Sequence, residues 1–236
     1  MKILQVRTFV GPNIYTYRRA IAMVVDLEDV AEMSSVQIPE FIPRLLEIAP
    51  GLQTHECSRG YPGGFLERLH EGTYMGHVIE HLALELQTMV GCEVSFGRAR
   101  ERKQPGHYNI VFEYEVAEVG EAAGRAAVEI IEELSHGRRH QGTDEIISKL
   151  RELRAQYGLG PSTAAIVEAA RQRGIPVMRI GDGSLVQLGW GAAQTRLNAS
   201  TTSKTSSVSV DVACDKWMTK KFLEEIGVPT PEGRRI

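Results

Sequence analysis

The sequence contains few cysteines, and this excludes one class of protein. Three are present, Cys57, Cys92 and Cys214, so any single pairing leaves one thiol unpaired. Small secreted domains that depend on disulfides are much richer in cysteine. We therefore expect a protein of the reducing cytoplasm.

Long apolar runs are also missing. No stretch approaches the roughly 20 residues that a membrane-spanning helix needs. The first residues carry one lysine and a short apolar run, and then Arg7, Gly11 and Pro12. They lack the hydrophobic region and the cleavage site of a signal peptide. The sequence therefore predicts neither a membrane protein nor a secreted one.

An excess of basic residues is absent as well. Lys and Arg number 27 against 30 Asp and Glu, which gives a formal charge of -3. Nucleic-acid-binding domains normally carry a basic excess, so no nucleic-acid partner is expected. Hydrophobic residues make up 42% and charged residues 24%, and both values are typical of a folded globular protein.

The 236 residues are enough for one large domain or two small ones. Apolar spacing changes at the glycine-rich segment 158–160, where we place a domain boundary between 1–158 and 159–236. We expect an α/β fold class, with an α+β N-terminal domain followed by the incomplete start of a second domain. The patterns predict strands over 1–9, 17–27, 93–96, 108–115, 175–180 and 185–190. They predict helices over 38–48, 73–90, 119–134, 143–157, 162–173 and 211–226, and a charged loop over 98–107.

The run GHVIEHLALE, residues 76–85, carries the clearest chemistry. At about 100° per residue, His77, His81 and Glu85 share one helix face, and apolar residues occupy the opposite face. Two histidines one turn apart can bind a single Zn²⁺. Glu80 lies at the edge of this face, where a general base that activates water would be placed. His-x-x-Glu-His is also the motif of the inverted zincins.

The third zinc ligand is open at this point. Glu85 is the predicted ligand because it lies one turn beyond His81. His55, Cys57 and His107 are rivals that only folding can bring near. The alternative interpretation is a polar helix face on which histidines and glutamates pair across turns.

Basic residues flank this helix in the sequence. Arg59, Arg68 and Arg98 are candidates to hold a carboxylate-rich ligand through charge-assisted hydrogen bonds. For residues 100–103 we favour the alternative of a solvated loop.

Two sets of motifs resemble a known family. KILQVRTFVGPNIYTYR, CSRGYPGGFLERLHEGTYMGHVIEHLALELQ and GHYNIVFEY resemble the N domain of cyanophycin synthetases. LGPSTAAIVEAARQRGIPVMRI, SLVQLGWGAAQTRL and TSSVSVDVACDKWMTKKFLEEIGVPTPEG resemble the entry into the ATP-grasp module of the same enzymes. The resemblance covers nearly the whole chain and follows the order of the family.

The resemblance implies an ATP-dependent ligase that joins aspartate and arginine into multi-L-arginyl-poly-L-aspartate, with ATP and Mg²⁺ as cofactors. It implies that the N domain binds the polymer and in some members cuts it as a metallohydrolase. The ATP-binding residues would lie outside this chain, so we expect no ligation by residues 1–236 alone. A cytoplasmic homo-oligomer is expected.

The resemblance also places the polymer beside two further residues. Ser162 is expected at the start of a helix, where unpaired N–H groups suit a carboxylate. Asp211, expected at the start of the last helix, would pair with an arginine side chain of the polymer. Arg59 and Arg98 complete the predicted polymer site. The alternative is that Ser162 caps its helix and Asp211 only favours its helix dipole.

Three functions therefore compete. The first is the N-terminal portion of a cyanophycin synthetase, which binds the polymer. The second is a zinc-dependent metallohydrolase that cuts the polymer, with Glu80 as its catalytic residue. The third is a polymer-binding module without catalysis. Bound zinc with hydrolysis would favour the second, and binding without turnover or metal would favour the third.

Overall fold

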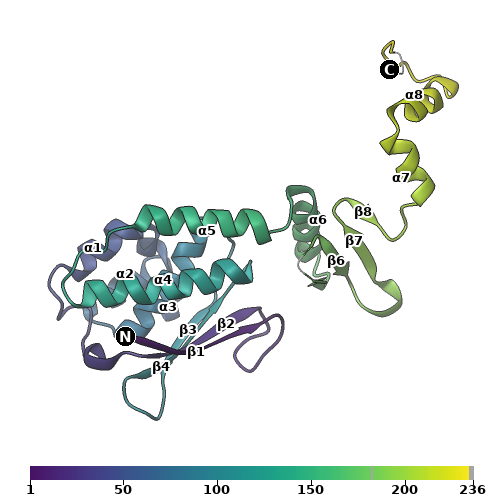
Figure 1. Ribbon diagram of the computed structural model, residues 1–236. Helices are drawn as coiled ribbons and strands as arrows, with labels where there is room; N and C mark the ends of the chain where they lie inside the picture. The colour runs from purple at the N-terminus through teal and green to yellow at the C-terminus, as the bar shows by residue number, and fades with distance from the viewer. Residues whose placement is uncertain (182, 234–236) are drawn as a thin grey trace. The chain divides into compact units, whose positions relative to one another are not determined.

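The computed structural model describes residues 1–181 and 183–233 (Figure 1). The chain divides into two compact units, Met1–Gly158 and Leu159–Ile236. Each unit combines helices with a four-stranded antiparallel sheet, and the predicted α/β class is confirmed. None of the helices in the described residues is long and apolar enough to cross a membrane.

An antiparallel sheet forms the base of the first unit (Figure 1). In spatial order its strands are β1 (Lys2–Phe9), β2 (Ala20–Asp26), β4 (His107–Glu113) and β3 (Gly97–Glu101). Side chains alternate along the central strand β2. Ile21, Met23 and Val25 are buried in the main core, whereas Ala20 and Ala22 lie in a small cluster on the other face.

Helices cover the main-core face of this sheet (Figure 1). They are α1 (Phe41–Ile48), α2 (Gly64–Glu71), α3 (Met75–Thr88), α4 (Ala117–Ser135) and α5 (Thr143–Tyr157). Three short 3-10 helices, η1 (Glu28–Val30), η2 (Pro50–Thr54) and η3 (Cys57–Arg59), connect them. α3 is the most deeply placed, and its side chains Val78, Ile79 and Leu82 are fully buried. Burial of these apolar side chains in the core therefore determines the orientation of the polar face of α3.

The predicted strand 93–96 is wrong, and β3 begins at Gly97 and extends into the predicted charged loop 98–107. The prediction gave too much weight to charge. β3 is an edge strand, and edge strands commonly carry charged side chains because these oppose association with another sheet. Ala99 alternates with Arg98 and Arg100, as the pleat requires.

The start of α3 also differs from the prediction. Tyr74, with extended backbone, is the N-cap residue, and the helix begins at Met75. The Thr73 hydroxyl does not cap the helix but lies 2.9 Å from Nδ1 of His77.

The second unit contains a small sheet with the order β5 (Val177–Arg179), β6 (Leu185–Leu188), β7 (Thr195–Asn198) and β8 (Thr201–Thr202). The other elements are α6 (Pro161–Gln172), η4 (Gly191–Ala193), α7 (Ser207–Cys214) and α8 (Lys216–Glu225). The predicted single helix 211–226 is therefore two helices. Asp215 divides them, because its side chain accepts hydrogen bonds from the first N–H groups of α8.

Candidate metal centre

α3 carries three of the predicted site residues, His77, Glu80 and His81, into a cleft of about 760 Å³. The other walls of the cleft come from residues 54–58 and from the segment 94–99, which includes the start of β3. The opposite flank of α3 is held in the main core. Arg68 from α2 and Tyr108 from β4 also line it, so the cleft gathers its polar groups from several separate parts of the chain.

Cys57 joins the two histidines of α3. Its Sγ lies 3.2 Å from Nε2 of His77. One ligand atom each from Cys57, His77 and His81 lies within 4.8 Å of the others, which is close enough to surround one metal ion. Cys57 has a left-handed backbone, with φ of 59°. Such a conformation costs a non-glycine residue about 1–3 kcal/mol and is found most often at functional sites.

Both histidines are oriented by groups behind them. Nδ1 of His77 lies 2.9 Å from the Thr73 hydroxyl, and Nδ1 of His81 lies 2.9 Å from Nδ1 of His55. The ring of Phe65 stacks on that of His81 at 3.8 Å. Because other side chains occupy both Nδ1 atoms, the Nε2 atoms are the ones left for a ligand.

The electrostatic setting keeps both imidazoles neutral. Burial lowers the pKa of His77 to about 4, and the nearby charge of Arg68 adds to this effect. Burial also lowers the pKa of His81 well below its usual value, with smaller contributions from His77 and His55. A neutral imidazole is the form that binds a metal. One thiolate and two imidazoles suit zinc, and three protein ligands leave a fourth position open, as in catalytic zinc sites.

Glu80 lies beside this cluster. Its Oε1 is 3.8 Å from Nε2 of His81, and it is only 4% exposed. Burial raises its pKa to about 8, against smaller lowering effects from a hydrogen bond with the Ala99 backbone and from the charge of Arg98. A Cβ at Gly97 would overlap the Glu80 carboxylate, so this glycine makes room for it. The carboxyl group is thus held between α3 and β3, at the side of the predicted metal position.

The structure places Glu85 outside the metal-binding group. Its Oε2 lies 3.0 Å from Nε2 of His55, and His55 in turn contacts His81. Of the three rivals, Cys57 is the residue that joins the two histidines. His107 bonds to the Pro105 carbonyl instead.

Two arginines line the cleft, Arg68 from α2 and Arg98 from β3. Arg68 is among the basic residues predicted from the sequence, and the fold brings it to the cleft from α2. Arg59 is placed differently, because it pairs with Glu67 at 2.7 Å and with Glu71. Arg98 and Arg68 are therefore the basic residues that the fold brings to the predicted metal position.

The predicted polymer residues of the second unit are exposed. Ser162 follows Pro161 in the first turn of α6, and Gly160 is the N-cap. The alternative role of Ser162 as a cap is therefore wrong. Asp211 lies within α7 and not at its start, so its expected position at a helix N-terminus is also wrong. Their contact with the polymer stays a prediction.

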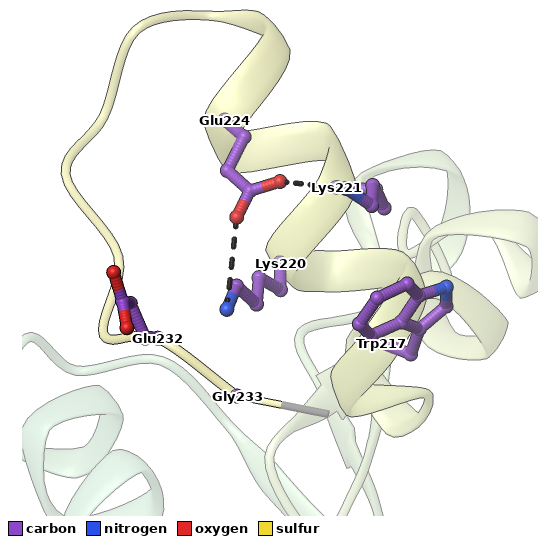
Figure 2. A pocket seen from close by; sticks show the side chains of 6 residues that line it. All are labelled: Trp217, Lys220, Lys221, Glu224, Glu232 and Gly233. Atoms are coloured by element: carbon purple, nitrogen blue, oxygen red, sulfur yellow. Dashed lines mark hydrogen bonds and ion pairs between the residues drawn. The ribbon is translucent and has the colours of Figure 1, made fainter. Parts of the chain in front are cut away.

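A hollow on α8 contains two lysines close to one carboxylate (Figure 2). Glu224 lies 3.0 Å from Nζ of Lys221 and 3.7 Å from Nζ of Lys220. Lys220 also donates to the carbonyl of Pro231 at 2.7 Å. Glu232 is a second carboxylate in the lining, so the two lysines face two carboxylates and the hollow has little net attraction for an anion.

Comparison with known proteins gives a consistent answer. Residues 22–136 match the cyanophycin synthase-like N-terminal domain. The whole chain is 49% identical over 241 residues to a cyanophycin synthetase from Geminocystis herdmanii and 45% identical over 240 residues to one from Synechocystis. The chain spans about 28% of the length of these curated relatives. Residues 22–136 are therefore a cyanophycin synthase-like N-terminal domain, and the whole chain is similar to the N-terminal region of cyanophycin synthetases.

Proposed function

We propose that this chain is the polymer-binding N-terminal part of an ATP-dependent ligase that joins aspartate and arginine into cyanophycin. The similarity over the whole chain to cyanophycin synthetases is the observation that carries this proposal. In the complete enzyme the cofactors are ATP and Mg²⁺, and we propose a cytoplasmic homo-oligomer. Ser162 and Asp211 remain candidates for contact with the end of the polymer.

The cleft over α3 is our candidate for polymer binding. Arg68 and Arg98 line it, and among the described residues neither forms an ion pair. Cyanophycin carries a carboxylate on every arginyl branch. Charge-assisted hydrogen bonds between guanidinium groups and carboxylates are stronger than neutral ones and favour a defined geometry.

Replacing Arg98 by alanine is expected to weaken polymer binding about 10–100-fold, because a hydrogen bond to a charged group contributes about 1.5–3 kcal/mol. Arg100→Ala is the matched control, since Arg100 lies on the same strand but outside the cleft. Titration calorimetry with a soluble cyanophycin segment measures both. Equal losses in the two variants would exclude a specific role for Arg98 and for the cleft.

Residues 1–236 alone are expected not to elongate a cyanophycin primer. Phosphoryl transfer depends on cationic groups and Mg²⁺ arranged around the transferred phosphate. Lys220 and Lys221 of α8 contact Glu224, and we assign them no such role. Labelled aspartate, ATP, Mg²⁺ and primer test this, with primer binding measured in the same sample. Primer elongation by the chain would contradict the assignment of the ATP-binding residues to other parts of the enzyme.

The Cys57–His77–His81 group favours a second candidate function, zinc-dependent cleavage of the polymer. A bound Zn²⁺ would act as a Lewis acid and lower the pKa of water at the amide to be cut. Cys57, His77 and His81 would hold the metal. Glu80, in its ionised form, would accept the proton of the attacking water and pass it to the leaving amine. Arg68 and Arg98 would orient the carboxylates of the polymer. Zinc analysis together with release of shorter polymer chains tests this function.

A further inference from the structure

A row of polar side chains, His81, His55 and Glu85, starts at Nδ1 of His81. Nδ1 of His81 is 2.9 Å from Nδ1 of His55, and Nε2 of His55 is 3.0 Å from Oε2 of Glu85. His81 is 5% exposed and Glu85 is 6% exposed. A buried carboxylate and a buried imidazole are costly unless each has a partner, and the half-buried His55 contacts both. In this row each group is the partner of the next.

The carboxylate of Glu85 determines which ring nitrogens of His55 and His81 carry protons. A carboxylate only accepts hydrogen bonds, so with one ring proton on each histidine Nε2 of His55 donates to Glu85. Nδ1 of His55 is then an acceptor, and Nδ1 of His81 must donate to it. With its ring proton on Nδ1, His81 carries no proton on Nε2. The row therefore leaves a lone pair on the atom of His81 that is free to bind a metal.

Contacts with the rest of the first unit hold His55 and Glu85 in place. A Cβ at Gly51 would overlap the Glu85 carboxylate, so the absence of a side chain there admits it. The backbone of His55 is held on both sides, because its N–H donates to Leu52 and its carbonyl accepts from Phe65. The ring of His55 is therefore fixed relative to α3.

We propose that His55 and Glu85 are positioning residues that fix His81 in the tautomer with Nδ1 protonated and Nε2 free for metal. The inference rests on the proposed metal centre and concerns how that centre is prepared before an ion arrives. Partners of this kind behind a metal-binding histidine change metal affinity about 10–100-fold.

The tautomer itself provides the first test. In zinc-free protein labelled with ¹⁵N-histidine, long-range ¹H–¹⁵N spectra distinguish the two ring nitrogens, and His55→Ala and His81→Ala assign the signals. We expect protonated Nδ1 in His81 and protonated Nε2 in His55. A proton on Nε2 of His81 would overturn the inference. This readout does not require zinc to bind, so it stands even if the proposed hydrolase function fails.

The second test is Glu85→Gln, which keeps the shape of the side chain and removes its charge. The amide N–H can donate to His55, which reverses each hydrogen bond in the row. We expect zinc affinity to fall about 10–100-fold in competition with a chromogenic chelator. Unchanged affinity would overturn the proposal. If the wild-type chain binds no zinc, the metal centre itself fails and the tautomers decide the role of the row.

Glu133→Gln is the matched control for the second test. Glu133 contacts Nδ1 of His140 at 2.8 Å, and the His140 side chain is 4% exposed. This pair has the same chemistry as Glu85 and His55 but is not connected to a metal-binding residue. Its loss is expected to leave zinc affinity unchanged. An equal fall in affinity for Glu133→Gln and Glu85→Gln would indicate general destabilisation and overturn the proposal.

Discussion

Glu80→Gln is expected to retain one zinc ion per chain and to slow cleavage of cyanophycin about 10²–10⁴-fold, the range typical of general acid–base catalysis. Glutamine fills the space beside Gly97 that Glu80 occupies, so the cleft keeps its shape. What it cannot do is accept a proton. The measurement is the rate at which new polymer ends form, together with the zinc content of the same sample.

Glu93→Gln is a suitable control for this experiment. Glu93 is an exposed carboxylate outside the cleft lining, and its replacement is expected to leave both zinc content and cleavage rate unchanged. Cleavage by Glu80→Gln at the wild-type rate would show that Glu80 does not act as the base. Loss of both zinc and cleavage would instead assign Glu80 a role in binding the metal.

Removing one member of the Cys57–His77–His81 group is expected to abolish stoichiometric zinc binding. Cys57→Ser and His77→Ala each delete one of three ligands from a site that has an open fourth position. We expect their zinc affinity to fall by at least the 10–100-fold known for residues that only support a ligand. Metal analysis after dialysis against a weak chelator measures the effect.

Cys214→Ser is the control for the cysteine variant, because Cys214 is exposed and lies in the other unit. It should retain as much zinc as the wild-type chain. If Cys57→Ser also retains it, the thiol is not a ligand. If His77→Ala retains it as well, the predicted metal centre does not exist, and the cleft is a binding site for polymer alone.

Elements with a clear apolar period were predictable from the sequence. The helix predicted over 143–157 has the bounds of α5, because its apolar spacing and flanking glycines agree. β3 was missed because a five-residue edge strand with exposed arginines has no alternating apolar pattern. The break between α7 and α8 was missed because a capping Asp215 in the middle of a helical pattern resembles any other polar residue.

Only the site residues that lie on a single helix could be predicted from the sequence. His77, Glu80 and His81 are brought together by helical spacing alone, which the sequence reports directly. Cys57 joins them through a left-handed bend 20 residues earlier, and no local pattern announces it. Glu85 shares the predicted helix face, yet His55 lies between its carboxylate and His81. The side chains that contact His81 from other segments are determined by tertiary packing, which the local sequence does not report.

Two glycines make room for the two buried carboxylates of this site. A Cβ at Gly51 would overlap the carboxylate of Glu85, and a Cβ at Gly97 would overlap that of Glu80. Both carboxylates therefore need a residue without a side chain at these positions. Neither glycine has the positive φ that usually explains a glycine. Alanine scanning tests the loss of side chains, so it would not reveal the role of either glycine. Enlarging either by one methyl group would displace a buried carboxylate while leaving every polar residue of the centre in place.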